Sequence, residues 1–302
     1  MRKVGLLVVG AAVAVVAGSG CSSDEIRPPF VDEKAAPADA IEGRIVVTTR
    51  GDVEYALAAF DAREESLDGI DDSDGARSPA YAPDGTRVAA ASNANGRGAI
   101  QIFTRGEPDT VVEGSGYFDH PTWSPDGTQL AYAHHPADGT WDIYVVDLAT
   151  GEAEALIDGD AQDWYPSWSP DGDTIAFTSD RDGDNAVWTV DMSTGELDKL
   201  VDSAGEDAEP SFSPDGETIV FASDRELNTW QIFTVPASGG EDTRLIRSDT
   251  VDRYPVYSPD GRYILVSTGY LAVYPADGGE LPNGANRWKL VDELTFSATW
   301  TD

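Results

Sequence analysis

The stretch Trp123-Ser124-Pro125-Asp126-Gly127 recurs along this chain at a nearly constant interval. An aromatic residue followed by Ser-Pro-Asp-Gly returns at three later positions, and a Tyr-Ala-Pro-Asp-Gly variant precedes them. The aromatic residues of these copies, with a truncated last one, are Tyr81, Trp123, Trp168, Phe212, Tyr257 and Trp300, and they lie 42 to 45 residues apart. A repeat of this length, with four short strands in each unit, is typical of β-propellers.

Each copy of the phrase predicts a tight turn between two strands. Pro pre-sets the backbone for the first central position of a turn, Asp tolerates the second, and Gly relieves the exit. In the copy at Trp168, short runs rich in β-branched and aromatic residues predict strands over residues 166–169, 173–179, 186–191 and 196–201. One such sheet cannot bury both of its faces alone, so the copies are expected to stack.

The folded part is expected to span residues 41–302, which accommodates about six repeats. Residues 44–49, 55–60 and 64–67 supply three strands without a preceding aromatic-Ser-Pro-Asp-Gly phrase. The C-terminal segment 296–300 can provide the missing strand and so remove the open sheet edges. We therefore predict an all-β, monomeric, six-bladed β-propeller of four-stranded antiparallel blades, whose first blade is closed by the C-terminal strand.

The N-terminus has the pattern of an export signal. Two basic residues precede an apolar run over residues 4–17, which is short for a transmembrane helix and fits a signal peptide. Small residues then precede Cys21, the only cysteine, and this resembles a bacterial lipoprotein processing site. We predict a signal peptide over residues 1–20, lipidation of Cys21 and a flexible tether over residues 21–40. The protein would then be exported, attached to a membrane through its lipid alone, and face the periplasm or the cell exterior.

The charge balance is strongly acidic, with a formal net charge of −35. Such a chain repels nucleic acid and anionic lipid head groups, so we expect no nucleic-acid partner. The acidic residues concentrate in turns, which is consistent with a solvated surface, and a cationic partner surface remains the functional alternative.

Two segments carry a resemblance to a known family. Residues 121–132 and 174–183 resemble the WD40-like β-propeller repeats of TolB-like periplasmic proteins, and the resemblance extends over about residues 41–302. It implies a propeller in the cell envelope that binds an envelope or periplasmic protein. TolB itself carries an additional α/β domain before its propeller, and residues 1–40 are too few to hold one.

The resemblance also places the candidate site. In such repeats the strand with the Ser-Pro phrase is innermost, and the loop before it lies at the mouth of the central channel. The copies agree in their framework but differ in the three residues before the aligned proline, where aromatic residues and Arg suit a protein ligand. Packing of the loops is the alternative role of these aromatic residues. The predicted binding residues are Arg77, Asp119, His120, Asp163, Trp164, Tyr165, Asp207, Glu209, Asp252, Arg253 and Tyr254.

An enzymatic function receives less support. Residues 21–302 contain no Gly-x-Ser-x-Gly motif, and none of the three histidines lies beside a nucleophile signature. We therefore predict a binding scaffold without a cofactor. The alternative is a metal-assisted lyase or hydrolase acting on an envelope or extracellular glycan, because some propeller lyases with similar repeats hold a divalent ion in the channel. Its candidate ligands would be His120, Asp119, Asp163, Asp207, Glu209 and Asp252.

Overall fold

The computed structural model describes most of the predicted propeller. The described residues are 33–35, 44–50, 55–61, 66–70, 73–92, 97–104, 108–226, 229–246, 248, 250–279, 287–291 and 295–301. They all belong to one compact unit, Val31–Asp302. The predicted signal peptide, Cys21 and the tether apart from residues 33–35 lie outside them. Among the described residues, no helix combines the length and the apolar character needed to cross a membrane.

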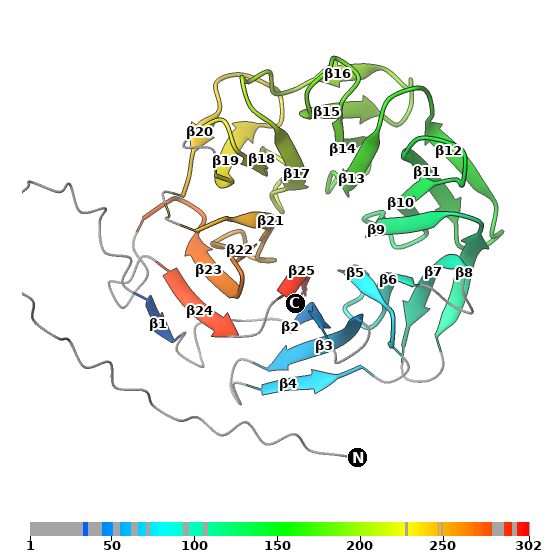
Figure 1. Cartoon of the computed structure of the whole chain (residues 1–302), viewed down its shortest axis with the longest axis horizontal. Helices are drawn as coiled ribbons and strands as arrows, with labels where there is room; N and C mark the ends of the chain where they lie inside the picture. Colours follow the sequence, from blue (N-terminus) through cyan, green and yellow to red (C-terminus); the bar gives the residue numbers. More distant parts are fainter. Residues whose placement is uncertain are drawn as a thin grey trace, which may run out of the picture. The chain divides into compact units, whose positions relative to one another are not determined.

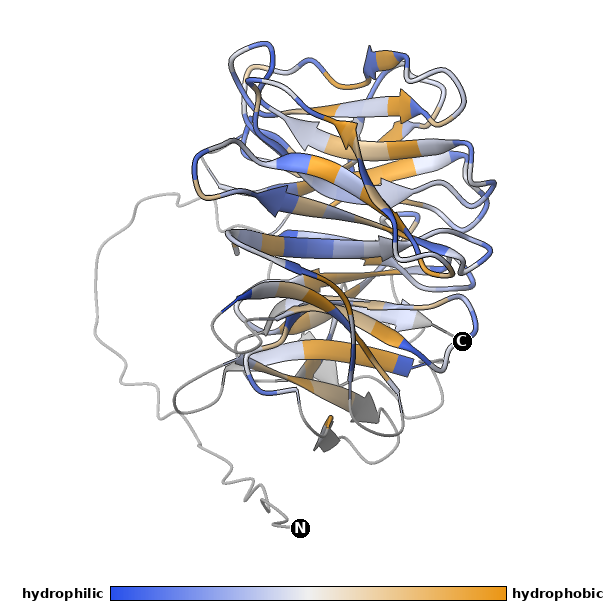
Figure 2. Ribbon diagram, turned by 90° about the vertical axis from the view of Figure 1, so that its right-hand side faces the viewer, coloured by the Kyte–Doolittle hydropathy of each residue, from blue (hydrophilic) through white to orange (hydrophobic). Residues whose placement is uncertain are grey.

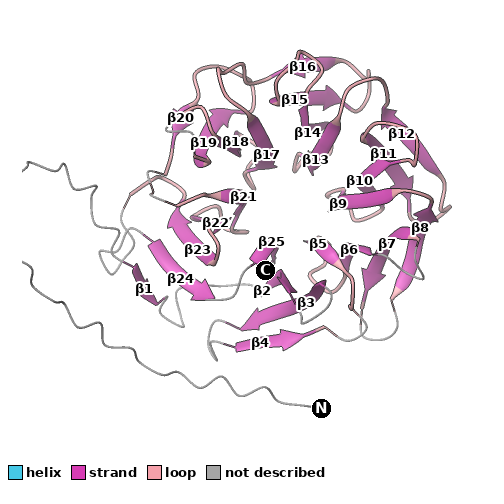
Figure 3. Cartoon of the chain, in the orientation of Figure 1, coloured by secondary structure: helices cyan, strands magenta, loops and turns pink. Residues whose placement is uncertain are grey.

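Six sheets form a ring around a central axis, and every regular element of the described chain is a strand (Figures 1 and 3). From the centre outward, blade 1 consists of β25 (Thr295–Thr301), β2 (Arg44–Arg50), β3 (Tyr55–Asp61) and β4 (Ser66–Gly69). Blade 2 consists of β5 (Arg77–Tyr81), β6 (Val88–Ser92), β7 (Gly98–Phe103) and β8 (Asp109–Gly114). Blade 3 consists of β9 (Tyr117–Trp123), β10 (Gln129–His135), β11 (Asp142–Asp147) and β12 (Ala153–Ile157).

The second half of the ring repeats this order. Blade 4 consists of β13 (Asp163–Trp168), β14 (Thr174–Ser179), β15 (Ala186–Asp191) and β16 (Leu197–Lys199). Blade 5 consists of β17 (Asp207–Phe212), β18 (Thr218–Ser223), β19 (Gln231–Pro236) and β20 (Thr243–Arg244). Blade 6 consists of β21 (Arg253–Tyr257), β22 (Tyr263–Ser267), β23 (Leu271–Pro275) and β24 (Arg287–Val291), with β1 (Glu33–Ala35) at its outer edge.

The predicted fold class is confirmed. The C-terminal strand β25 pairs antiparallel with β2, so the two ends of the propeller share blade 1. Strand β1 is an addition to the prediction, because Glu33–Ala35 falls within the expected tether and pairs parallel with β24. This pairing covers part of the outer edge of blade 6, an edge that would otherwise be open to another strand.

The repeated phrase builds the turn that follows each innermost strand. In blade 3 the Ser124 hydroxyl donates to Asp126 Oδ1 at 2.6 Å, and the Gly127 amide donates to the Ser124 carbonyl at 2.9 Å. Gly127 adopts φ = 69°, a left-handed conformation that favours glycine. The aromatic residue of the phrase, Trp123, is buried and donates through Nε1 to the Ala80 carbonyl of blade 2. The phrase therefore sets both the turn and the contact between neighbouring blades.

The core lies between neighbouring blades. Ile100 of blade 2 and Leu130 of blade 3 are fully buried in one cluster, and Phe177 of blade 4 shares another with Ile143 of blade 3. Figure 2 shows hydrophobic residues along the stacked strands and hydrophilic residues in many of the connecting loops. Burial of apolar surface between adjacent sheets thus holds the ring together.

The ring has two different faces. We call the face at which the innermost strands begin the mouth face, and the face at which they end in the Ser-Pro-Asp-Gly turns the turn face. Consecutive strands of a blade are antiparallel, so the second strand of each blade runs back to the mouth face.

Candidate functional site

An irregularity in the innermost strands forms the frame of the candidate site. In blade 3, Asp119 pairs with Ala133 and Thr122 with Ala131, so His120 and Pro121 together face one residue of β10. Equivalent β-bulges occur in the innermost strands of blades 2, 4, 5 and 6. The bulged residues before the prolines are Ser78, His120, Tyr165, Glu209 and Tyr254, with φ between 49° and 61°.

This backbone conformation is costly for residues other than glycine. A left-handed conformation costs roughly 1–2 kcal/mol per L-residue, yet it recurs at the same position in five blades. Bulges re-aim side chains and are frequent beside functional sites. The sequence prediction placed these positions in a loop before the innermost strand; the structure instead places them inside the strand. The prediction missed the bulge because it depends on pairing with the next strand.

Four of the five bulged residues border a cavity of about 300 Å³ at the mouth end of the channel. The residues lining it are Thr48, Tyr55, Arg77, Ser78, Asp119, His120, Tyr165, Tyr254 and Ser297. They come from blades 1, 2, 3, 4 and 6, so the cavity belongs to the ring as a whole. Five of the eleven predicted site residues are therefore brought together here.

Arg77 and Asp119 both line the cavity and form an ion pair. Arg77 Nε donates to Asp119 Oδ2 at 3.0 Å, and its Nη2 donates to the Phe118 carbonyl at 3.0 Å. The Ser78 hydroxyl donates to Asp119 Oδ1 at 2.6 Å. Burial alone would raise the pKa of Asp119, but the adjacent His120 and Arg77 and the Ser78 hydroxyl lower it below its usual value. Asp119 is therefore an anion that ties blade 2 to blade 3.

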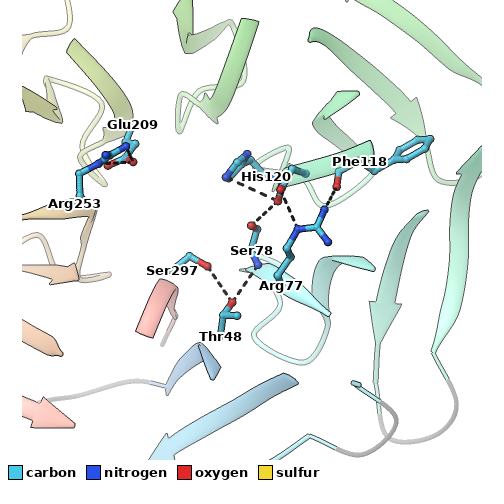
Figure 4. A network of polar contacts seen from close by, with 9 residues as sticks. Thr48, Arg77, Ser78, Phe118, His120, Glu209, Arg253 and Ser297 are labelled. Carbon is cyan, nitrogen blue, oxygen red and sulfur yellow. Dashed lines mark hydrogen bonds and ion pairs between the residues drawn. The ribbon is translucent and has the colours of Figure 1, made fainter. Parts of the chain in front are cut away.

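A second polar network joins blades 1 and 2. The backbone amide of the bulged Ser78 donates to Thr48 Oγ1 at 3.1 Å, and this hydroxyl lies 3.0 Å from Ser297 Oγ (Figure 4). Ser78 and Ser297 occupy the same column of the repeat alignment as His120 but were not among the predicted site residues. Thr48 and Tyr55 were also not predicted, because they lie on β2 and β3 and therefore outside the aligned positions before the prolines.

Aromatic rings form another part of the cavity wall. The ring centroids of His120 and Tyr165 are 4.1 Å apart, and those of Tyr165 and Tyr254 are 6.1 Å apart. Burial lowers the pKa of His120, which favours its neutral form. Burial also raises the pKa values of Tyr165 and Tyr254, so both phenols stay protonated. This part therefore offers an uncharged aromatic surface with hydroxyl groups.

Glu209 and Arg253 are held by each other beside the cavity. Arg253 Nε donates to Glu209 Oε1 at 2.8 Å, and the Tyr254 amide donates to Glu209 Oε2 at 2.7 Å. The Glu209 amide donates to Thr178 Oγ1 at 3.1 Å, which adds a contact to blade 4. Arg253 also stacks over the Trp230 ring, with Cζ 3.9 Å from its centroid. Neither Glu209 nor Arg253 is among the residues that line the cavity.

The remaining predicted residues lie outside the cavity lining. Asp163 and Asp207 are almost completely buried and accept hydrogen bonds from Arg181 Nη2 at 2.9 Å and Arg225 Nη2 at 2.7 Å. Asp252 is fully buried and accepts a hydrogen bond from Thr250 Oγ1 at 2.9 Å. Trp164 is half-buried. The three aspartates thus have structural partners within their own blades.

The sequence profile of the TolB beta propeller domain matches residues 40–201 and 182–271. The chain belongs to the TolB β-propeller domain family. A search of curated protein sequences finds no match.

Solved TolB-type structures share the fold. TolB from Acinetobacter baumannii superposes with a TM-score of 0.74 and 23% identity, over 86% of this chain and 66% of that one. A protein assigned as TolB from Agrobacterium tumefaciens gives 0.69 and 20%, over 84% and 89%. The chain thus spans slightly less than two thirds of the A. baumannii TolB. At these identities the likeness shows the propeller fold.

An oligogalacturonate lyase in complex with manganese is also similar, with a TM-score of 0.59 and 15% identity over 80% of this chain and 72% of that one. Across the described part of the chain, no three His, Cys, Asp or Glu side chains are grouped to hold a metal ion. Three candidate ligands of the alternative function, Asp163, Asp207 and Glu209, form ion pairs with arginines.

Proposed function

We propose that this TolB-family propeller is a lipid-anchored extracytoplasmic scaffold that binds a protein partner at its channel cavity. Export and attachment at Cys21 follow from the N-terminal sequence pattern. The family and the TolB-type structural neighbours support a role in protein interaction in the cell envelope.

The observation that carries the proposal is the cavity built by the bulged residues. The blades repeat one framework, yet the bulge presents Ser, His, Tyr, Glu and Tyr in successive blades. Residues that vary on a repeated scaffold give one site a particular chemistry. Half-buried tyrosines and an arginine are the residue types that anchor protein interfaces. A partner loop that enters the cavity would meet both the aromatic rings and the Arg77–Asp119 ion pair.

The test is affinity capture from envelope extract with residues 31–302 as bait, which keep the whole compact unit. The cavity variant combines Tyr165→Ala and Tyr254→Ala, because both rings border the cavity. The matched control is Trp164→Ala, which removes a half-buried aromatic residue next to Tyr165 that does not line the cavity.

We expect the parent and the Trp164→Ala control to retain the same protein and the cavity variant to lose it. Thermal unfolding curves establish that each bait is folded. Retention of that protein by a folded cavity variant would refute binding at this cavity. Attachment is tested separately, by palmitate labelling of the full-length chain and of Cys21→Ala in a bacterial host; labelling that persists in Cys21→Ala would refute the anchor.

A further inference from the structure

The direction in which the chain enters the propeller has a consequence for its orientation at a membrane. Strand β1 pairs parallel with β24, with Glu33 opposite Arg287, Lys34 opposite Trp288 and Ala35 opposite Lys289. The direction of β24 therefore fixes the direction of β1. Strand β1 begins twelve residues after Cys21, and it is the first described segment after the predicted anchor.

The direction of β24 follows from the pairing within blade 6. The innermost strand β21 runs from the mouth face to the turn face, since Tyr257 opens the Tyr-Ser-Pro-Asp-Gly turn. Strands β22, β23 and β24 then alternate, because each pairs antiparallel with the one before it. Strand β24 consequently runs from the turn face to the mouth face, and so does β1. Glu33 lies at the turn-face end of the blade.

The channel cavity lies at the other face. Arg77 is the first residue of the innermost strand of blade 2, and strand β5 starts at the mouth face. Tyr55 is the first residue of β3, which also starts there because it follows the returning strand β2. Both residues line the cavity. The chain thus enters the propeller at the face opposite to the one on which the cavity opens.

We infer that the lipid anchor holds the propeller with its turn face toward the membrane and its cavity toward the aqueous compartment. This inference rests on the lipid-anchored scaffold proposed above. Glu33 is twelve residues after Cys21, a separation of at most about 40 Å for a fully extended chain. Since Glu33 lies at the turn face, an anchor within this distance leaves the cavity to be approached from the side away from the membrane.

The turn face carries exposed carboxylates, which affect how it interacts with a membrane. Asp126, Asp171 and Asp215 are exposed there, and hydrogen bonds from the preceding serines keep the pKa of each below its usual value. These carboxylates are therefore charged at neutral pH and are repelled by anionic head groups. We therefore expect the attachment at Cys21, and not adhesion of these turns, to keep the turn face near the membrane.

Energy transfer from the protein to a membrane dye tests this orientation. Residues 21–302 are coupled through Cys21, the only thiol of the chain, to a maleimide phospholipid in phosphatidylcholine vesicles that contain an acceptor dye. A donor dye is attached to p-azidophenylalanine at position 217 or at position 204. Glu217 is exposed after the turn of blade 5 and Ala204 is exposed before its innermost strand, so the two positions lie on opposite faces of one blade.

We expect stronger energy transfer from position 217 than from position 204, because six strand residues separate the two faces by roughly 20 Å. In a Lys34→Pro/Ala35→Pro variant, which lacks both backbone donors, the difference between the two positions should largely disappear. A Lys34→Ala/Ala35→Ser variant should keep the difference, since it retains the backbone donors.

Equal transfer from the two positions, or stronger transfer from position 204, would overturn the inferred orientation. A difference that survives in the proline variant would overturn the role of β1. The lipid is attached chemically and no partner is present, so neither result depends on lipidation in the cell or on partner binding. A failure of the proposed function would appear in the capture and labelling experiments instead.

Discussion

Glu209 of blade 5 accepts hydrogen bonds from two residues of blade 6. Arg253 Nη2 donates to Glu209 Oε1 at 2.5 Å, and the backbone amide of Tyr254 donates to Glu209 Oε2 at 2.7 Å. The carboxylate is almost completely buried, whereas the guanidinium is partly exposed. One side chain thus fixes the bulge of the next blade and neutralises a cation at the edge of the channel. Arg77 and Asp119 form a similar ion pair between blades 2 and 3, but there the earlier blade supplies the arginine and the later blade the carboxylate.

This contact predicts a loss of stability in Glu209→Gln. The amide keeps the shape of the side chain but leaves the Arg253 charge without its anion. We expect the free energy of unfolding to fall by roughly 1.5–3 kcal/mol, the range for hydrogen bonds to charged groups. Urea unfolding measures the change, with the exposed Glu217→Gln as a control expected to stay within about 0.5 kcal/mol. Equal midpoints for the parent and Glu209→Gln would contradict the structural role of this pair.

The backbone of the bulge predicts which residues position 120 tolerates. His120 has φ = 49°, a region that Asn adopts readily and that β-branched residues avoid. Both His120→Asn and His120→Val remove the ring next to Tyr165, so their comparison isolates the backbone. We expect His120→Val to be less stable than His120→Asn by about 1 kcal/mol or more in urea unfolding. Equal stability of the two variants would show that the bulge relaxes without cost.

His120 also predicts a pH dependence of stability. Its pKa in the folded protein lies below the ordinary 6.5 because burial disfavours the imidazolium. The unfolded chain therefore takes up a proton first as pH falls. The stabilising contribution is complete above pH 6.5 and is lost as pH falls through the lower folded-state pKa.

We therefore expect the free energy of unfolding of the parent, relative to His120→Asn, to decrease between pH 7 and pH 5. The slope cannot exceed about 1.4 kcal/mol per pH unit for a single proton. Urea titrations at several pH values measure this difference. Parallel pH profiles for the two proteins would contradict the assignment to His120.

Closure of the ring predicts the effect of a C-terminal deletion. Removing residues 294–302 deletes β25, the innermost strand of blade 1, together with the buried Trp300. The deletion exposes the edge of β2 and opens the ring between blades 1 and 6. We expect a sharp decrease in the midpoint of thermal unfolding, larger than that of Trp300→Ala, which should cost about 3–5 kcal/mol. An unchanged melting curve for the deletion would reject closure of the ring by β25.

The repeat pattern was sufficient to predict the fold. The Ser-Pro-Asp-Gly turn and the short apolar runs are local signals, and their period set the number of blades. The same period also predicted that the C-terminal strand pairs with β2, because blade 1 needed one more strand to be complete. The alignment of the repeats also singled out the positions before the prolines, although it did not predict that these residues form β-bulges.

The composition of the cavity required the three-dimensional arrangement. Asp163 and Asp119 are both acidic residues shortly before the aligned prolines, yet Asp163 pairs with Arg181 inside blade 4 while Asp119 borders the cavity. Thr48 and Tyr55 enter it from strands that carry no repeat signal. Local sequence specifies turns and strand periodicity through backbone preferences. Which side chains meet across the channel depends on bulges and on contacts between blades, and these arise from pairings between residues far apart in the sequence.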